Sequence, residues 1–214
     1  MKIEGVFFDL DGTLADTKSV LFQSYVHFMQ SYNLPSSVEQ FNSLSGTPIK
    51  ASIVELCNKY QLNVDRDATA DEYASSVETE YLNSPLVSGA SQLIDSLRSK
   101  AIPIALVTSA TRDLVRGWIK KNSLGGSFNA IITSDDVTKT KPNPEPYLNA
   151  LNQLGISGFD SLAVEDSEIG VTSAISSGIF TIGLGLTYLK KFGEQDFLAV
   201  HDLHEAKKVI ENYL

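Results

Sequence analysis

Short runs of apolar residues recur along the chain, separated by segments with helical periodicity. Residues 3–8 are β-branched or aromatic, with no polar alternation after Glu4, which is typical of a strand buried on both faces. Similar short runs follow at residues 102–107, 130–132, 161–164 and 179–182. The pattern therefore predicts five buried strands.

The segments between these runs predict helices. Two of them place their apolar residues on one helical face: Leu93, Ile94 and Leu97 in the first, and Leu114, Val115, Trp118 and Ile119 in the second. Asn143 followed by Pro144 predicts an N-cap with proline at the first helical position. Asp202 with Glu205 predicts the start of the last helix. Alternating strands and helices indicate an α/β fold, a doubly wound, Rossmann-like parallel sheet.

Residues 17–84 break this alternation, because they contain only helical patterns. The segment follows the first strand directly and is far longer than a crossover between two strands needs. We therefore expect an inserted all-helical cap at 17–84, with residues 1–16 and 85–214 forming the α/β core. A cap in this position could close over the end of the first strand as a lid.

Composition and charge narrow the classes of partner. The chain has 214 residues, 43% of them hydrophobic and 20% charged, which is enough apolar material for a substantial core. Seventeen Lys and Arg against 26 Asp and Glu give a net charge of −9. This acidity disfavours binding to nucleic acid or to an anionic membrane surface, since both require clustered cations. A monomer or weak homodimer that binds a small molecule is expected.

The single cysteine and the absence of long apolar runs indicate a cytoplasmic protein. Cys57 lies in an apolar periodic stretch and cannot form an internal disulfide, so we expect a buried structural thiol. No run approaches the roughly 18 apolar residues of a membrane span. The N-terminus reaches Asp9 too early for a signal peptide.

Two other possible motifs carry little weight. The segment Gly183-Leu184-Gly185 lacks the third glycine of a dinucleotide fingerprint and is expected to be a loop after the fifth strand. The histidines lie in predicted helices, where solvated or packed side chains are the better interpretation: His27, His201 and His204. The sequence therefore gives no support to His-based nucleophilic catalysis.

Candidate chemistry lies where the predicted strands end. The first strand runs into Asp9, Asp11, Gly12 and Thr13, the second into Thr108 and Ser109, the loop after the third carries Lys141, and the fourth runs into Glu165 and Asp166. In a parallel sheet these ends meet at one edge, where ligands bind. Four carboxylates, a hydroxyl and an ammonium group are thus expected in one place.

Carboxylates gathered in this way need a cation. No His or Cys lies at these strand ends, which favours Mg²⁺ over Zn²⁺. Asp9 and Asp166 fit the role of ligands, with the backbone carbonyl of Asp11 close to Asp9 in the chain.

Asp9 and Asp11 also suit a two-step phosphoryl transfer. Asp9 would attack phosphorus, and Asp11 would protonate the leaving alkoxide and then activate water. Gly12 frees the backbone for the turn, and Gly12 and Thr13 would border the substrate. Thr108 and the Ser109 amide would hold a phosphoryl oxygen, and Lys141 would supply positive charge.

Each of these motifs alone also has a purely structural interpretation. Asp9 to Thr13 could form an Asx-type turn, and residues 165–167 could cap a helix. Lys141 could be a solvated surface residue. Their occurrence together at successive strand ends favours a shared site.

Taken together, the motifs resemble those of the haloacid dehalogenase superfamily, in the group that includes phosphoglycolate phosphatase and β-phosphoglucomutase. The matching residues are 9–14 with Asp16 and Thr17, then Thr108, then Lys141 and Pro142, then 165–167 with Gly170 and Gly178. The resemblance implies that Asp9 is the nucleophile and Asp11 the acid/base. It also implies that Thr108 and Lys141 contact the phosphoryl group, that Asp166 binds Mg²⁺, and that Glu165 joins the metal shell directly or through water.

Departures from the family pattern bear on the substrate. β-Phosphoglucomutase-like members carry a histidine where this chain has Leu21, and an arginine in the cap loop where it has Ile49. Dehalogenases usually lack the second aspartate, whereas Asp11 is present. Thr47 and Lys50 are the cap residues expected to reach substrate. We therefore expect a Mg²⁺-dependent phosphatase of a small phosphorylated metabolite. The alternatives are a sugar-phosphate mutase and a non-catalytic binding or regulatory protein on the same fold.

Overall fold

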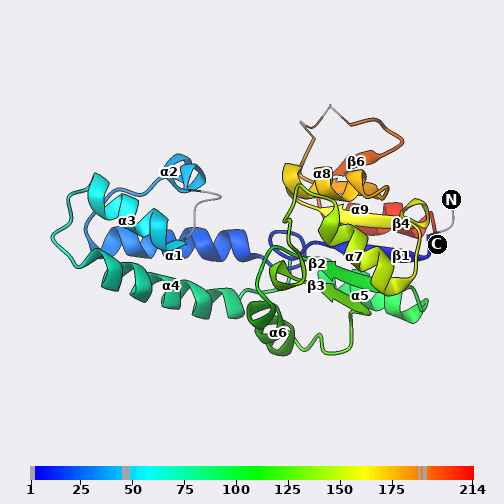
Figure 1. Ribbon diagram of the computed structural model, residues 1–214, viewed down its shortest axis with the longest axis horizontal. Helices are drawn as coiled ribbons and strands as arrows, with labels where there is room; N and C mark the ends of the chain where they lie inside the picture. The colour runs from blue at the N-terminus through cyan, green and yellow to red at the C-terminus, as the bar shows by residue number, and fades with distance from the viewer. Residues whose placement is uncertain (1–2, 45–48, 188, 190–191) are drawn as a thin grey trace. The chain divides into compact units, whose positions relative to one another are not determined.

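The computed structural model describes residues 3–44, 49–187, 189 and 192–214. The chain divides into two compact units (Figure 1). One consists of Met1–Asp16 with Pro85–Leu214, and the other of Thr17–Ser84. Among the described residues, no helix combines the length and the apolar character needed to cross a bilayer.

The first unit is built on a parallel sheet, six-stranded over the described residues, with the strand order β3-β2-β1-β4-β5-β6. The predicted α/β fold is confirmed. The strands are β1 (Gly5–Phe8), β2 (Ile104–Val107), β3 (Ala130–Ile132), β4 (Ser161–Glu165), β5 (Phe180–Leu184) and β6 (Phe197–Val200). Every residue of β1, β2 and β4 is buried, which explains their continuous apolar sequences.

The order of the strands reverses beside β1. In the register of the sheet, Phe8 pairs with Leu106 of β2 on one side and with Val164 of β4 on the other. The residues that follow these three strands therefore emerge together at one edge. Such a switch point is where open α/β sheets bind their ligands.

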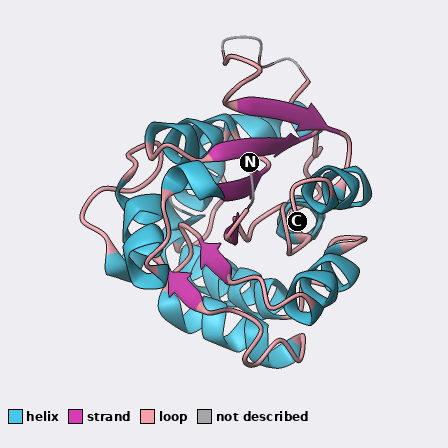
Figure 2. Cartoon of the chain, turned by 90° about the vertical axis from the view of Figure 1, so that its right-hand side faces the viewer, coloured by secondary structure: helices cyan, strands magenta, loops and turns pink. Residues whose placement is uncertain are grey.

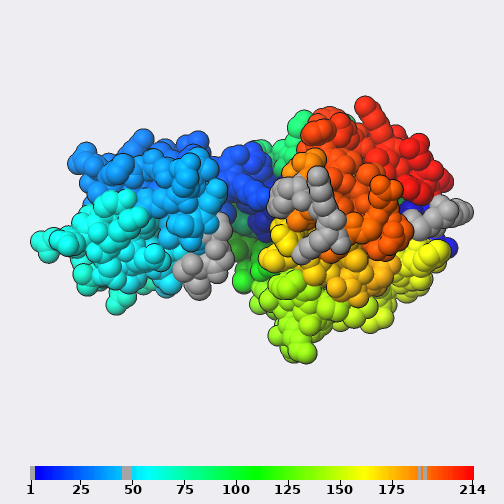
Figure 3. Space-filling model, turned by 90° about the horizontal axis from the view of Figure 1, so that it is seen from above, coloured from blue at the N-terminus to red at the C-terminus, as the bar shows by residue number. Residues whose placement is uncertain are grey.

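Helices cover both faces of this sheet (Figures 1 and 2). They are α5 (Ala90–Ser99), α6 (Arg112–Lys121), α7 (Glu145–Leu154), α8 (Glu168–Ser176) and α9 (Leu203–Glu211), with short 3₁₀ turns η1 (Ser134–Asp136) and η2 (Gly158–Asp160). On one face α7 packs against α8, and on the other α5 packs against α9. In Figure 3 the C-terminal residues, in red, lie at the surface of this unit beside the orange segment that contains β6.

Beneath α7 and α8 the sheet forms a buried hydrophobic core. Phe7, Val107, Tyr147, Ala163 and Ala174 are all fully buried in it. Small residues on β4 and α8 allow the helices to approach the sheet closely, while Phe7 and Tyr147 fill the remaining space.

The described part of the second unit is helical, as expected. It contains α1 (Thr17–Ser31), α2 (Val38–Ser43), α3 (Ile49–Lys59) and α4 (Arg66–Leu82). Its own apolar core includes Tyr25, Met29, Ile53, Leu56 and Cys57. Cys57 is a buried free thiol, in agreement with the sequence-based expectation. Asp65 caps α4 by accepting hydrogen bonds from the amides of Asp67 and Ala68.

Three local predictions need correction. Gly183 and Leu184 lie inside β5 rather than in a loop, because Gly183 lets the ring of Phe197 on β6 pack closely against the strand. Strand β6 itself was not predicted, although its four residues form an apolar run like those of the other strands.

The other two corrections concern residues at the starts of α7 and α9, which are Pro144 and His201. Pro144 is the N-cap of α7 and not its first helical residue, although the Asn143 side chain still accepts a hydrogen bond from the Glu145 amide. His201 precedes α9 because Asp202 is the N-cap of that helix, as its spacing from Glu205 predicts.

Replacing Leu97 by alanine tests the amphipathic assignment of α5. Leu97 is fully buried, so Leu97→Ala should lower the free energy of unfolding by about 2–5 kcal/mol through lost burial and the cavity created. Gln92→Ala on the exposed face of α5 is the matched control and should change it by less than about 0.5 kcal/mol. Urea unfolding followed by the fluorescence of Trp118, the chain's only tryptophan, measures both. Equal losses for the two variants would contradict the assignment.

Candidate active site

Asp9 stands at the end of β1, where the chain turns sharply. Its amide donates to the Val164 carbonyl at 3.1 Å, which continues the pairing with β4 for one more residue. The amides of Leu14 and Ala15 then both donate to the Leu10 carbonyl at 2.9 Å. Gly12 has φ of +84°, a backbone conformation that a side chain would disfavour. The turn therefore keeps both Asp9 and Asp11 at the edge of the sheet.

Lys141 reaches this edge from the loop after β3 and is buried. Its ammonium group donates to three acceptors: Asp9 Oδ1 at 2.8 Å, the Val107 carbonyl at 2.8 Å and Glu165 Oε1 at 2.6 Å. An ammonium group has three N–H donors, so all of them are used within the protein. Lys141 is thus a fixed charge that joins the ends of β1, β2 and β4.

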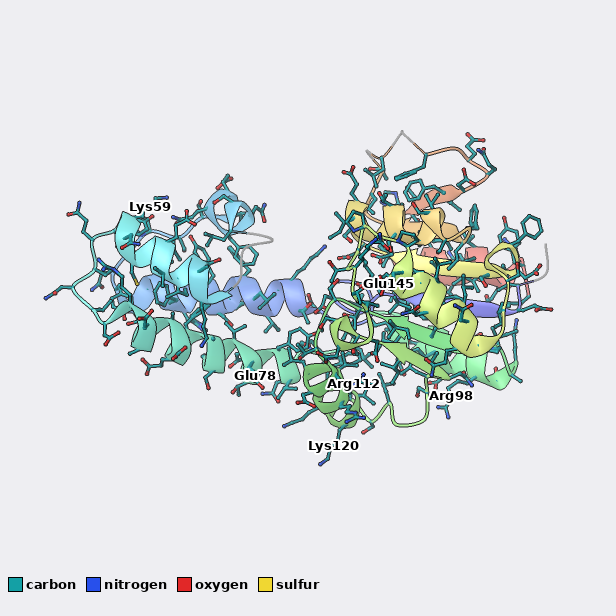
Figure 4. All side chains as sticks on the ribbon, in the orientation of Figure 1. Lys59, Glu78, Arg98, Arg112, Lys120 and Glu145 are labelled. Atoms are coloured by element: carbon teal, nitrogen blue, oxygen red, sulfur yellow. The ribbon has the colours of Figure 1, made fainter. Side chains whose placement is uncertain are left out.

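The loop that carries Lys141 is held in place by Glu145, the first residue of α7 (labelled in Figure 4). The Glu145 carboxylate accepts hydrogen bonds from the amide of Thr138 at 2.7 Å and from the amide of Lys139 at 3.0 Å. These bonds lower the pKa of Glu145 below its ordinary value, with the Thr138 amide as the main cause. The carboxylate therefore stays ionised and fixes the backbone two residues before Lys141.

Glu165 ends β4 and has no exposed surface. Besides Lys141, its carboxylate accepts from the Tyr147 hydroxyl at 2.7 Å and from the Ser167 hydroxyl at 3.3 Å. Ser167 is also the N-cap of α8, where its hydroxyl accepts from the Gly170 amide at 3.1 Å. The carboxylate is therefore bound from three directions by side chains of three segments.

Burial and charge act in opposite directions on these groups. Burial alone would lower the pKa of Lys141, but the carboxylates of Asp9 and Glu165 outweigh it and raise that pKa. Burial raises the pKa of Glu165, against the opposing effect of Lys141. Burial, reinforced by the charge of Glu165, also raises the pKa of Tyr147 well above its ordinary value. Lys141 consequently remains an ammonium ion and Tyr147 remains a hydrogen-bond donor.

Thr108, immediately after β2, orients Asp11. Its hydroxyl donates to Asp11 Oδ2 at 3.2 Å and accepts from the Ala110 amide at 3.0 Å. Because a hydroxyl has a single proton, its donor is used on Asp11 in this arrangement. Thr108 was expected to hold a phosphoryl oxygen, and the contact that the structure adds is this one to Asp11.

Asp9, Glu165 and Asp166 bring ligand oxygens within 4.8 Å of one another, close enough to share a metal ion. Three carboxylates beside one ammonium group leave two negative charges uncompensated. A hard divalent cation with oxygen ligands fits this charge and this donor set. The Asp11 carboxylate is not part of that group of three.

The remaining expected residues have varied positions. Ser109 is exposed after β2, and Thr13 is fully buried, with a hydroxyl that makes no hydrogen bond to any described residue. Lys50 forms an exposed ion pair with Asp71 inside the helical unit. Thr47 lies outside the described residues.

Sequence reasoning missed two of the groups that complete this cluster. One is the Val107 carbonyl, which no sequence pattern reveals. The other is Tyr147, whose burial in α7 follows from its helical position but whose hydroxyl contacts a residue 18 positions away. A tyrosine on the buried face of the helix after the Lys141 loop was the available signal, since buried tyrosine hydroxyls usually find a partner.

Removing the charge of Lys141 tests how far the cluster depends on it. Lys141→Met should lower the free energy of unfolding by about 3–5 kcal/mol in the absence of divalent ions, because it leaves two buried carboxylates without a cation. Lys139→Met, in the same loop but exposed, should be nearly neutral. Urea unfolding of both variants provides the measurement, and identical midpoints would show that the ammonium group is not needed.

Known proteins are similar to this chain over most of its length. The validoxylamine A 7′-phosphate phosphatase of Streptomyces hygroscopicus subsp. limoneus is 26% identical, with 94% of each chain covered. The pyrophosphatase PpaX of Oceanobacillus iheyensis is 29% identical over 90% of each chain. The crystal structure of a suspected β-phosphoglucomutase from Thermotoga maritima superposes with a TM-score of 0.87 at 25% identity, covering 99% of this chain and 100% of that one.

The family itself follows from a match that spans most of the chain. Residues 6–184 match the model of the haloacid dehalogenase-like hydrolases, a range that runs from β1 to the end of β5 and contains the whole cluster. The resemblance inferred from the four motifs is thereby confirmed. The chain belongs to the haloacid dehalogenase-like hydrolase family.

Proposed function

We propose that this hydrolase is a Mg²⁺-dependent phosphatase that cleaves a small phosphate monoester through an aspartyl phosphate on Asp9. The observation that carries the proposal is the pairing of two differently held carboxylates at the end of β1. Asp9 accepts from a buried ammonium group, whereas Asp11, two residues later, accepts from a hydroxyl. The first environment places a fixed positive charge beside the carboxylate that would attack phosphorus, and the second gives the other carboxyl group a hydroxyl partner, which can both donate and accept.

In the first step an oxygen of Asp9 forms a bond to phosphorus as the bond from phosphorus to the ester oxygen breaks. Asp11 transfers its proton to the departing alkoxide, so the product leaves as a neutral alcohol. Thr108 keeps Asp11 in one orientation throughout, because its hydroxyl contacts the carboxylate.

In the second step water attacks the phosphorus of the aspartyl phosphate. Asp11, now ionised, takes a proton from that water, the bond between Asp9 and phosphorus breaks, and inorganic phosphate is released. Both carboxyl groups return to their starting protonation states, so the cycle balances.

Lys141 neutralises the negative charge of the Asp9 carboxylate before the reaction and that of the phosphoryl group during it. With all three donors used in the free protein, it can contact the transferring group only by giving up one partner. Asp9 is the natural partner to release, since its charge passes to the phosphoryl oxygens as the new bond forms. Val107 and Glu165 would keep the ammonium group in place during that exchange.

Asp9 and Asp166 would hold Mg²⁺, with Glu165 contributing directly or through water. Such an ion reduces the repulsion between the carboxylates and a phosphate dianion. The name of one relative agrees with this class of substrate, because that protein is a phosphatase of a phosphorylated metabolite. Another is a pyrophosphatase, which cleaves a phosphoanhydride and shares with the proposal the hydrolytic transfer of a phosphoryl group.

Two aspartate variants test the assigned roles with p-nitrophenyl phosphate and Mg²⁺. Asp9→Asn should lower kcat by roughly a thousandfold or more, because the nucleophile is lost. Asp11→Asn should give a burst of close to one p-nitrophenolate per protein followed by slow turnover. This leaving group needs no proton, whereas breakdown of the aspartyl phosphate needs the base. Asp95→Asn on the exposed face of α5 is the control.

Three results would contradict the proposal. Full activity in Asp9→Asn would exclude it as the nucleophile. No phosphate release by folded, metal-bound wild-type protein from a panel of phosphorylated metabolites would exclude the phosphatase. A mutase would instead isomerise a sugar phosphate, respond strongly to a bisphosphate and release little phosphate.

The metal assignment has its own test. Asp166→Asn should raise the Mg²⁺ concentration needed for half-maximal activity by at least about tenfold, because a charged ligand becomes neutral. Calorimetric titration with Mg²⁺ should show the same weakening without any substrate. Asp95→Asn should match the wild type in both measurements, and an unchanged Asp166→Asn would remove this residue from the metal site.

A further inference from the structure

Tyr147 contacts the charged cluster of Asp9, Lys141 and Glu165 from the buried core of the sheet. It lies on α7, is fully buried, and has its ring centroid 5.2 Å from Lys141 Nζ. Its hydroxyl donates to Glu165 Oε1 at 2.7 Å. One side chain therefore contacts both members of the Lys141–Glu165 ion pair.

The hydroxyl of Tyr147 and the ammonium group of Lys141 share the same oxygen. Glu165 Oε1 accepts from Lys141 at 2.6 Å and from Tyr147 at 2.7 Å, and a carboxylate oxygen has about two lone-pair sites. That oxygen is thus fully used inside the protein. Within the described part of the chain, the other oxygen, Oε2, accepts only the longer bond from the Ser167 hydroxyl, at 3.3 Å.

The backbone of α8 closes the other side of the same carboxylate. A Cβ added at Gly170 would overlap Oε1, Oε2 and the carboxyl carbon of Glu165. Gly170 therefore leaves space that the carboxylate fills, while Tyr147 determines how the carboxylate is turned within that space.

We propose that Tyr147 is a positioning residue of this active site, whose hydroxyl holds Glu165 in the orientation that anchors Lys141. The inference rests on the proposed phosphatase function for its kinetic consequences. Because Glu165 and Val107 then retain two of the three ammonium donors, Asp9 is the partner from which Lys141 is released to the phosphoryl group. Tyr147 acts only through Glu165 and never contacts substrate.

The variant Tyr147→Phe isolates the hydroxyl, because it keeps the ring beside the ammonium group. We expect kcat to fall about tenfold, the loss typical of one hydrogen bond to a charged group, with KM changed less than about twofold. In a Glu165→Ala background, which has no acceptor for the hydroxyl, the same substitution should change kcat less than about twofold. An equal loss in both backgrounds would overturn the proposal.

A second variant moves Glu165 by a different route. Gly170→Ala should also lower kcat at nearly constant KM, since its methyl group displaces the carboxylate. Gly125→Ala is the matched control, because a Cβ there meets no atom within 4 Å. Wild-type kinetics in Gly170→Ala would contradict the proposal that the orientation of Glu165 anchors Lys141.

A spectroscopic measurement tests the inference even if the phosphatase proposal fails. In ¹H–¹⁵N spectra of lysine ammonium groups, the signal of Lys141 is identified by its loss in Lys141→Met. Tyr147→Phe should shift this signal and speed its exchange with water, whereas Tyr60→Phe, which removes a hydrogen bond to Gln40 in the helical unit, should not. An unchanged Lys141 signal in Tyr147→Phe would show that the hydroxyl does not position the ammonium group.

Discussion

The edge of the sheet depends on the hydrogen bonds and ion pairs that the Lys141 ammonium group makes there. Without it, Asp9 and Glu165 would be buried carboxylates at the ends of neighbouring strands, an arrangement that costs several kcal/mol per uncompensated charge. Its third acceptor, the Val107 carbonyl, adds the adjacent strand. A single side chain thus joins the three strand ends at the point where the strand order reverses. The geometry of the fold and the electrostatics of the site share this constraint.

The rest of the site can be understood as support for that one charge. Glu145 fixes the loop that delivers Lys141, and Tyr147 and Gly170 fix the carboxylate that receives it. Asp11 differs from Asp9 in its neighbours, because it accepts a hydrogen bond from the Thr108 hydroxyl. Two carboxyl groups separated by one residue therefore have different hydrogen-bond partners, an ammonium group for Asp9 and a hydroxyl group for Asp11.

Much of this architecture could be predicted from sequence because the strands of a parallel sheet are buried on both faces and carry continuous apolar runs. Strand β6 was overlooked although its four residues are all apolar. Gly183 was misplaced because the reason for a glycine there, the close packing of the Phe197 ring, depends on tertiary structure. The acidic residues and Lys141 could be found because charged groups after buried strands are conspicuous. Tyr147 could not, since its apolar ring satisfies the helix pattern and its hydrogen bond depends on tertiary structure.

The two points at which the chain leaves and re-enters the core are themselves hydrogen-bonded. The Asp16 amide donates to the Pro85 carbonyl at 2.9 Å, and the Val87 amide donates to the Leu14 carbonyl at 2.8 Å. The two core segments on either side of the insert are thus hydrogen-bonded to each other. These bonds involve no residue of the inserted segment. An exchange of the intervening segment would leave these two hydrogen bonds available, so the α/β core could keep its geometry with a different insert.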